Sequence, residues 1–310
     1  MSLFTLYVVT LLFGLIPSVI VLSSIIAITD LLIGYMNWFL ILEKVIFILL
    51  CSILFLFLIL GVEALLRNIK KKPDILVDTN KRLGPISVVM TAYNDEDAIG
   101  EAVADFINRE NVDEIIVIDN NSTDRTNEIA KKGGARIVYE PNQGYGFACQ
   151  KAMISTKNDI VVLVEGDCTY TGSDIKKLTS YLDCTDLVLG TRTTRELTAI
   201  GTQMNWFLNW GNFFLAKLLQ LRFWGDVRLT DVGCTYRVLR KENAELLKKS
   251  YNAGGNHFSP HMIKIALSKG LKVIEIPITF HPRKGESKVA GKNFWSAFKL
   301  GLRMLVEIYF

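Results

Sequence analysis

The first 62 residues of the 310-residue chain contain almost no charge, and this absence divides the sequence. Asp30, Glu43 and Lys44 are the three charged residues there, and every other charged residue follows Val62. A distribution this uneven excludes a purely soluble protein, a disordered chain and a collagen-like one. The pattern predicts membrane-type helices joined to a soluble-type domain of about 250 residues.

Cysteine usage and net charge exclude further classes. The five cysteines are an odd number and form no CxxC pair. They argue against a disulfide scaffold and a zinc site, and fit a reducing compartment. The formal net charge of +4 is too small to indicate a nucleic-acid partner. The absence of a GxGxxG motif after the first soluble strand argues against a dehydrogenase, and the absence of GxxxxGK[ST] excludes a P-loop NTPase.

Two apolar runs predict two transmembrane helices within residues 1–66. Residues 3–28 carry no charge and are long enough to cross about 30 Å of hydrocarbon. The second run covers residues 45–62, and one span plus a re-entrant segment is the alternative. Basic residues gather in the linker of residues 67–84, so the positive-inside rule places the large domain in the cytoplasm. The expected localisation is a multi-pass protein of the cell membrane.

Beyond Pro73 short apolar runs alternate with helical segments. The runs cover residues 86–90, 114–118, 135–139 and 160–164. Apolar strands between helices predict an α/β fold, with a mostly parallel sheet flanked by helices on both faces. Ligands of such sheets bind beyond the carboxyl ends of the strands. Polar clusters follow three of these ends, at residues 91–95, 119–124 and 165–169, and we expect them to converge on one site.

Two carboxylates, Glu165 and Asp167, flank a glycine at the end of a fully apolar strand. This arrangement suits Mg²⁺ or Mn²⁺, because Mg²⁺ usually takes one or two carboxylates and completes its shell with substrate phosphate oxygens and water. The competing interpretation is an ordinary acidic turn. Asp119 has two readings as well, as an acceptor for a base or ribose or as part of a segment that caps the next helix.

Two further segments have features of anion sites. Gly144 and Gly146 open a helix, where glycine permits close backbone approach and the helix N-terminus favours anions. Arg283 and Lys288 lie on a glycine-containing loop after an apolar strand, and both suit a diphosphate. The alternative for that loop is a solvated basic segment near an anionic membrane.

Two segments near the end of the chain combine aromatic and basic residues. Residues 204–224 hold seven tryptophan and phenylalanine residues, and the predicted amphipathic helix of residues 291–310 alternates basic residues with apolar ones. Both predict helices that lie at a bilayer surface. A core helix is the alternative in each case.

Taken in order, these segments resemble family 2 glycosyltransferases of the GT-A fold, in particular the dolichyl-phosphate (polyprenyl-phosphate) mannose and glucose synthases. The similar segments are residues 88–95, 118–124, 142–148, 165–167, 190–192, 211–212, 231–237 and 283–288. They define a GT-A domain over residues 85–290. The chain departs from the family pattern at Asn120 and Glu165, where relatives carry aspartate, and at Thr169, where the mannose synthases carry glutamine.

The resemblance implies a role for each matching residue. The residues assigned to the nucleotide-sugar are Thr91, Tyr93, Asp95, Asp119, Asn121, Gly144, Gly146, Glu165, Arg283, Ser287 and Lys288. Glu165 and Asp167 would hold the metal. Asp231 falls at the family's candidate base, with Arg192 and Arg237 near the acceptor phosphate.

The resemblance also implies the reaction. One sugar would move, with inversion and metal dependence, from UDP-glucose, UDP-N-acetylglucosamine or GDP-mannose to polyprenyl (dolichyl) phosphate at the cytoplasmic membrane face. A different acceptor, or a nucleotidyltransferase with a similar α/β site, is the alternative. The expected partners are the nucleotide-sugar, the lipid phosphate and the lipid bilayer, without nucleic acid, and a homo-oligomer is left open.

Overall fold

The computed structural model describes residues 22–29, 38–69, 84–202, 204–223, 226–285 and 294–309. The chain divides into two compact units, Met1–Ile75 and Leu76–Phe310. In the first unit, residues 22–29 are helical and helix α2 spans Trp38–Ile69.

The two predicted membrane spans are not supported by the helices that the structure describes. Across this part of the chain, no helix combines the length and the apolarity needed to cross a membrane. Residues 3–21 of the first predicted span, and residues 70–83 of the predicted basic linker, lie outside the described residues.

The second unit is built on a sheet whose strand order, within the described residues, is β3-β2-β1-β4-β6-β5-β7. The strands are β1 (Ile86–Ala92), β2 (Val112–Asp119), β3 (Arg136–Tyr139), β4 (Ile160–Glu165), β5 (Leu187–Thr191), β6 (Arg237–Arg240) and β7 (Val273–Pro277). β6 pairs antiparallel with β4 and β5, and the other pairs are parallel. The predicted mostly parallel sheet is therefore confirmed, with one antiparallel strand that the sequence pattern did not reveal.

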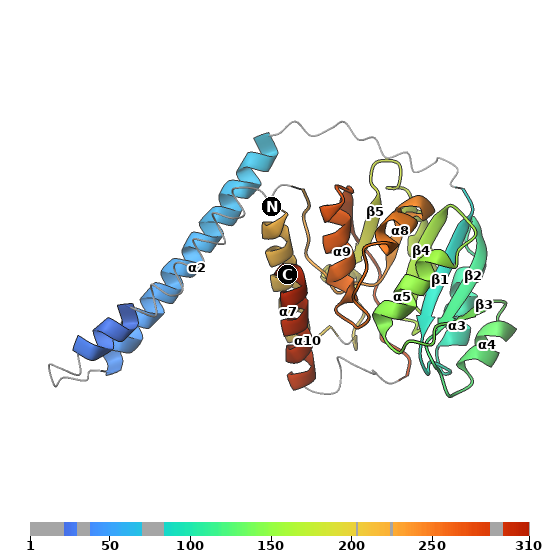
Figure 1. The fold of residues 1–310 in the computed structure, drawn as a ribbon, viewed down its shortest axis with the longest axis horizontal. Coiled ribbons are helices and arrows are strands. Elements are labelled where there is room, and N and C mark those ends of the chain that lie inside the picture. Colours follow the sequence, from blue (N-terminus) through green and yellow to red (C-terminus); the bar gives the residue numbers. More distant parts are fainter. Residues whose placement is uncertain are drawn as a thin grey trace. The chain divides into compact units, whose positions relative to one another are not determined.

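Helices cover both faces of this sheet (Figure 1). They are α3 (Ile99–Ile107), α4 (Thr126–Lys132), α5 (Tyr145–Ile154), α6 (Ile175–Thr179), α7 (Trp206–Arg222), α8 (Lys241–Lys248), α9 (Phe258–Ser268) and α10 (Phe294–Tyr309). Val89 of β1 packs in the cluster that holds α5 and α7 to α10, whereas Val88 and Met90 face the cluster of α3, α4 and α6. Alternate side chains of one strand thus enter two cores, which is why β1 is apolar without interruption.

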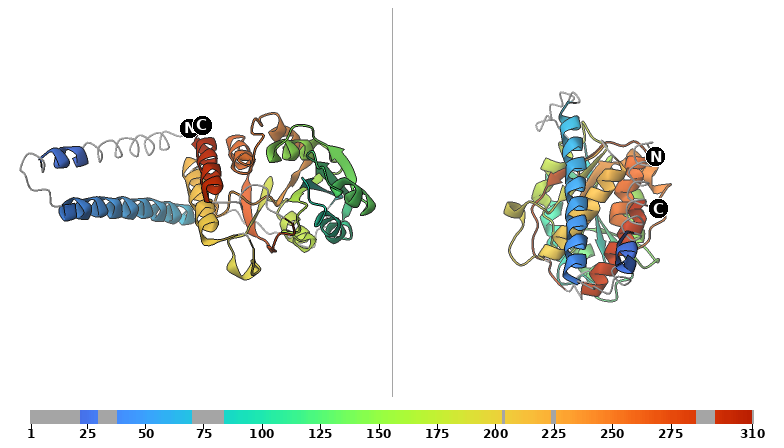
Figure 2. Two further views of the ribbon diagram at one scale, coloured as in Figure 1. Left: turned by 90° about the horizontal axis from the view of Figure 1, so that it is seen from below. Right: turned by 90° about the vertical axis from the view of Figure 1, so that its left-hand side faces the viewer.

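Helix α10 packs against α7 and α9, and Figure 2 shows α7 and α10 side by side. Met304 and Ile308 of α10 are buried in the core, whereas Leu302 and Val306 are exposed. Glu307 accepts a hydrogen bond from Lys264 and pairs with His261 at 2.6 Å, so its carboxylate fastens α10 to α9. The predicted helix is present, and one of its faces is anchored to the domain. Its predicted contact with a bilayer stays a prediction.

The carboxyl ends of β1, β2, β4 and β5 meet at one edge of the sheet because these strands are parallel to one another through the sheet. β6 runs the opposite way, so its first residue, Arg237, and the segment before it reach the same edge. This edge carries the polar residues that the sequence singled out.

Candidate active site

Two cavities open at this edge of the sheet and share a wall. The polar cavity, about 460 Å³, is lined by the ends of β1 and β4, by Asn120 and by the start of α5. The apolar cavity, about 380 Å³, lies between α7 and α10. Both are lined by Glu165, Arg192, Gly233, Arg283, Leu300 and Met304. A ligand in one cavity therefore meets a ligand in the other beside two arginines and a carboxylate.

The end of β1 and the loop after it form one wall of the polar cavity. Thr91, Tyr93 and Asp95 line it, as the sequence predicted. The Asp95 carboxylate accepts a hydrogen bond from the Tyr93 amide at 3.0 Å and from Arg283 Nη2 at 3.2 Å. Asp95 is thus held in place from its own loop and from the loop after β7.

Asp119 and Asn121 do not line either cavity in this structure. Asp119 is buried and its two oxygens accept hydrogen bonds from the Ser122 amide at 3.0 Å and from Asn127 at 2.9 Å. Asn121 has a φ of 67° and donates to the carbonyl of Pro141 at 3.0 Å. Both residues organise the loop after β2, and the predicted nucleoside contacts receive no support from their position.

Asn120 explains one departure from the family pattern. Its Nδ2 donates to the carbonyl oxygens of Glu140 at 3.1 Å and Asn142 at 2.7 Å, and its Oδ1 accepts from the Gly144 amide at 2.7 Å. An ionised aspartate could not donate to two carbonyls. Asparagine at this position therefore fixes the segment that leads into α5, a role that the sequence pattern alone did not reveal.

Gly144 and Gly146 serve close packing at the start of α5. The Gly146 amide donates to the Gly254 carbonyl at 2.9 Å, and the Phe147 amide reaches the same oxygen at 3.3 Å. A Cβ on Gly146 would lie 2.2 Å from the Ala253 carbonyl oxygen. These amides are already satisfied by backbone, so the predicted anion site at this helix N-terminus would need other donors. Gly144 still lines the polar cavity.

Replacing Gly146 by alanine is expected to destabilise the domain by about 1–3 kcal/mol, because the added methyl group must push the 253–254 backbone away. Gly211→Ala in α7 is the matched control, since an added Cβ there meets no atom within 4 Å. That change should be neutral or stabilising, because alanine is the better helix former. Urea unfolding of both variants measures the difference, and equal effects would show that the Gly254 contact matters little.

Glu165 lies at the shared wall of the cavities, and the neighbouring Asp167 lines the apolar cavity beside it. Burial raises the pKa of Glu165 to about 8, and the neighbouring Asp167 charge adds to the shift. Asp167 is 1% exposed and accepts hydrogen bonds from the amide of Thr169 at 3.1 Å and from its hydroxyl at 2.6 Å. Thr169 therefore positions Asp167, although the mannose synthases carry glutamine there.

Arg283 bridges two of the acidic loops. Its Nη1 lies 3.3 Å from Asp167 Oδ2 and its Nη2 lies 3.2 Å from Asp95 Oδ1. Its Nε is buried and has no hydrogen-bond partner among the described residues. The arginine thus neutralises two carboxylates at the junction of the cavities. Ser287 and Lys288 of the same predicted motif lie outside the described residues.

A divalent cation fits this acidic pair. Within the described residues no group of three or more His, Cys, Asp and Glu side chains is arranged to hold a metal. Glu165 and Asp167 would therefore supply two ligands at most, and the remaining ligands must come from a bound molecule and water. Such partial coordination is common for Mg²⁺ at phosphate-bearing substrates. The raised pKa of Glu165 also marks a place where a cation would relieve repulsion.

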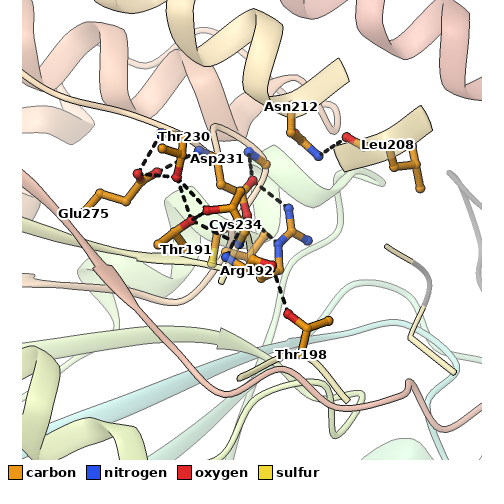
Figure 3. Close-up of polar contacts among 12 residues, drawn as sticks. Thr191, Arg192, Thr198, Leu208, Asn212, Thr230, Asp231, Cys234 and Glu275 are labelled. Carbon is orange, nitrogen blue, oxygen red and sulfur yellow. Dashed lines mark hydrogen bonds and ion pairs between the residues drawn. The ribbon is translucent and has the colours of Figure 1, made fainter. Parts of the chain in front are cut away.

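Arg192, which lines both cavities, forms a bidentate ion pair with Asp231 behind it (Figure 3). Arg192 Nε lies 2.7 Å from Asp231 Oδ2, and Arg192 Nη2 lies 2.8 Å from Oδ1. The Asp231 side chain has no exposed surface. Burial alone would raise the pKa of Asp231, but its interactions with Arg192 outweigh burial and hold the pKa below its usual range. A carboxylate that is buried, ionised and paired through both oxygens with an arginine is poorly suited to accept a proton as the predicted base. In this structure the contacts of Asp231 fix the position of the Arg192 guanidinium.

Arg237 is the other residue that the sequence placed near the acceptor phosphate besides Arg192. It is 1% exposed, and it donates to the carbonyl oxygens of Cys234 at 3.1 Å and Ser259 at 2.8 Å. It lines neither cavity. The predicted contact of Arg237 with the acceptor phosphate therefore receives no support from this position. A basic residue at the start of a strand gives no sign in the sequence of which way its side chain points.

The fold is an α/β sheet, and a polar and an apolar cavity meet at the carboxyl ends of its strands beside Glu165, Arg192 and Arg283. Residues 87–246 match the family described as glycosyl transferase family 2. The chain belongs to glycosyl transferase family 2 and is a glycosyltransferase.

Two curated relatives come from Haloferax volcanii. The chain is 33% identical to a dolichyl-phosphate hexose transferase over 66% of its own length and 86% of that protein. It is 30% identical to the low-salt glycan biosynthesis hexosyltransferase Agl6 over 70% of its own length, and spans about half of that relative, 52%. These relatives agree with the class that the sequence motifs implied.

The fold recurs in a solved glucosyl-3-phosphoglycerate synthase of Mycobacterium tuberculosis, in complex with Mn²⁺, UDP and glucosyl-3-phosphoglycerate. The TM-score is 0.56, the identity is 19%, and the alignment covers 77% of this chain and 84% of that one. At this identity the likeness establishes the shared α/β GT-A-type fold and nothing about substrates.

Proposed function

We propose that this glycosyltransferase moves a hexose or N-acetylhexosamine from a nucleotide-sugar to a polyprenyl (dolichyl) phosphate, with inversion and with Mg²⁺ or Mn²⁺. The observation that carries the proposal is the meeting of the polar and the apolar cavity at Glu165, Arg192 and Arg283. A water-soluble donor and a lipid acceptor need two such compartments with an anion-binding junction.

The donor belongs to the polar cavity. Thr91, Tyr93 and Asp95 line the polar cavity with hydrogen-bonding groups, and Glu165 and Arg283 line it at the junction with the apolar cavity, where Asp167 lies next to them. A bound divalent cation would stabilise the charge of the leaving nucleoside diphosphate. Arg283 would share that task, because it lines both cavities at their junction.

The acceptor belongs to the apolar cavity. Phe207, Leu208 and Phe214 of α7 line one wall, and Leu302 and Leu305 of α10 line the other. Trp206, Trp210, Phe213 and Phe214 are exposed on α7 at helical spacing, at 76%, 66%, 37% and 55%. Aromatic side chains in such numbers suit the interface of a bilayer. A prenyl chain that entered from the membrane would bring its phosphate to Arg192.

The chemistry needs little from a base. A phosphate monoester has a second pKa of about 6, so the acceptor is mostly a dianion at neutral pH. One phosphate oxygen forms the bond to the anomeric carbon, while the bond to the diphosphate oxygen breaks and the electron pair leaves with the nucleoside diphosphate. Arg192, held by Asp231, orients the attacking phosphate. This explains why a buried, ionised Asp231 is compatible with catalysis.

We infer further that the residues of the first unit attach the enzyme to a membrane, with the catalytic unit in the cytoplasm. Apolar side chains such as Phe47, Leu54 and Leu58 of α2 are more than 60% exposed in the isolated chain. The basic residues that follow, including Arg67 and Lys70 to Lys72, support a cytoplasmic position for the domain under the positive-inside rule.

The test is mass spectrometry of the lipid fraction. Full-length protein in mild detergent is offered polyprenyl phosphate, Mn²⁺ and a panel of UDP- and GDP-sugars. A new hexosyl- or N-acetylhexosaminyl-phospholipid is expected, with release of the nucleoside diphosphate. In a parallel reaction supplied with an NTP, consumption of the NTP with release of pyrophosphate would establish a nucleotidyltransferase instead. Release of nucleoside diphosphate without a lipid product would keep the transferase and reject the lipid acceptor.

Replacing both Trp206 and Trp210 by serine is expected to lower transfer to a long polyprenyl phosphate in liposomes, because the exposed aromatic face would no longer hold α7 at the bilayer. The turnover of a short, water-soluble prenyl phosphate should change little. Leu246→Ser, at another exposed apolar residue on α8, is the control. Equal losses with the long and the short acceptor would mean that α7 acts within the domain and not at a membrane.

A further inference from the structure

The loop of Asp231 is tied to strand β7 by a single carboxylate, that of Glu275. Its Oε1 accepts a hydrogen bond from the Asp231 amide at 2.7 Å. Its Oε2 accepts from both the amide and the hydroxyl of Thr230, each at 2.7 Å. Glu275 therefore accepts hydrogen bonds from two consecutive backbone amides and one hydroxyl group (Figure 3). One of these amides belongs to Asp231, the residue that pairs with Arg192.

Thr230 extends this contact to the other side of Arg192. Its hydroxyl oxygen lies 3.0 Å from that of Thr191 and 2.8 Å from that of Thr193. Since the one hydroxyl hydrogen of Thr230 is given to Glu275, the two flanking threonines must be the donors in these contacts. The charge on Glu275 thus sets the direction of hydrogen bonding around residues 191–193, whose middle residue is Arg192.

The space around Arg192 is tight, so its position depends on these loops. A Cβ on Gly233 would lie 3.0 Å from Arg192 Nη2 and 2.6 Å from Asn212 Oδ1. The Arg192 guanidinium also stacks over the ring of Phe280 at 5.3 Å. A shift of the 230–233 loop would therefore be passed directly to the guanidinium.

Glu275 is costly to keep as a carboxylate. The pKa of Glu275 is raised to about 7, mainly by burial and in smaller part by the charge of Asp231, and the hydrogen bonds from residues 230 and 231 oppose this rise. A carboxylate that is kept at such a cost calls for a reason beyond packing. Glu275 lines neither cavity, so it does not itself touch a substrate.

We propose that Glu275 is a positioning residue for the transfer reaction: through Thr230 and Asp231 it sets the guanidinium of Arg192 at the junction of the two cavities. The acceptor end of this inference rests on the proposed function, in which Arg192 receives the acceptor's phosphate. The geometric end, from Glu275 to Arg192, stands on the contacts above. The sequence motifs gave no sign of this role, because Glu275 lies 83 positions from Arg192 in the chain.

The central test replaces Glu275 by glutamine, which has the same size but puts an amide group against backbone donors. The KM for the lipid phosphate should rise by about tenfold or more, since small displacements of a positioning group cost that much or more. The KM for the nucleotide-sugar should stay unchanged. Glu114→Gln is the matched control: Glu114 accepts from Ser87 at 2.8 Å and from Arg136 at the opposite edge of the sheet. It should leave both KM values as they are.

A double-mutant cycle separates positioning from general destabilisation. In an Arg192→Lys background, Glu275→Gln should add little further loss, because the group it positions has already gone. Additive losses would overturn the proposal. Thr230→Val should reproduce the acceptor effect and Thr230→Ser should restore it, which provides a second route if the glutamine variant folds poorly.

An arginine NMR measurement tests the geometry without any turnover. In full-length protein labelled at arginine nitrogen, the Arg192 Nε–H signal, assigned from Arg192→Lys, should be sharp and shifted by its pairing with Asp231. Glu275→Gln should broaden or move that signal, whereas Glu114→Gln should not. An unchanged signal would reject the role of Glu275 even if transfer to a lipid phosphate is confirmed. Absence of lipid transfer by the native enzyme would reject the proposed function and leave this readout to decide on Glu275.

Discussion

Asp167→Asn should abolish measurable sugar transfer, with turnover at least about 10³-fold lower, because it removes one of the two carboxylates that would hold the divalent cation, and the cation's positive charge would stabilise the leaving diphosphate. Asp167 lines the apolar cavity next to the junction and is 1% exposed. Hydrogen bonds from the amide and the hydroxyl of Thr169 fix the orientation of its carboxylate. Asparagine keeps an oxygen for the Thr169 donors, so the change is one of charge more than of shape. Steady-state kinetics with a nucleotide-sugar and polyprenyl phosphate measures the loss.

The second readout of Asp167→Asn is binding. Thermal stabilisation of the native protein by a nucleoside diphosphate plus Mn²⁺ should exceed that by either alone, and this synergy should vanish in the variant. Asp174→Asn is the control, since Asp174 is also buried and accepts a backbone amide, from Thr279 at 2.7 Å, but lines neither cavity. Near-native turnover of Asp167→Asn would overturn the assignment of the metal to this pair.

Removal of Asp231 should cost less than removal of Asp167. Asp231 acts on Arg192 and does not line either cavity, whereas Asp167 faces the apolar cavity directly. This order of effects separates the interpretation of Asp231 as a positioning residue from its interpretation as the reaction's base.

The candidate residues that the structure brings together at the two cavities share one property. Thr91, Tyr93, Asp95, Glu165 and Arg192 all lie at or just beyond the carboxyl end of a parallel strand. Parallel strands bring those ends to one edge whatever the rest of the chain does, so the alternation of apolar runs and helices is enough to predict that these residues meet.

The misplaced residues depend on partners far away in the sequence. Gly146 looked like an anion site because its partner, the Gly254 carbonyl, lies more than a hundred positions on. Arg237 looked like an acceptor ligand because nothing local shows that β6 is antiparallel and turns this side chain into the core. Glu275 gave no signal, since its meaning comes from two amides contributed by another loop. Local pattern predicts strands and their ends, but not which distant backbone group a side chain satisfies.

Arg283→Gln should move two measurements in opposite directions. Arg283 lies between Asp95 and Asp167, at 3.2 and 3.3 Å, where it already neutralises the carboxylates that a metal would use. Without it, the affinity of Mn²⁺ for the nucleotide-free enzyme should rise several-fold, because the cation no longer competes with the guanidinium for Asp167. Transfer should nevertheless fall by about 10²–10³-fold, because one of the donors that stabilise the leaving diphosphate has gone.

The opposing signs identify what Arg283 does. A residue with a purely structural role would weaken metal binding and transfer together, whereas a residue that exchanges carboxylates for phosphate would separate them. Arg136→Gln is the matched control, because Arg136 pairs with Glu114 at 2.8 Å at the amino end of β3, away from both cavities.

Titration of free Mn²⁺ by electron paramagnetic resonance, with and without a nucleoside diphosphate, measures the change in Mn²⁺ affinity. In the native enzyme the nucleotide should strengthen Mn²⁺ binding both by ligating the metal and by drawing Arg283 away from Asp167, so the strengthening should be smaller in Arg283→Gln, where only the first contribution remains. If the nucleotide strengthens Mn²⁺ binding equally in both proteins, Arg283 is not the group through which donor and metal are linked.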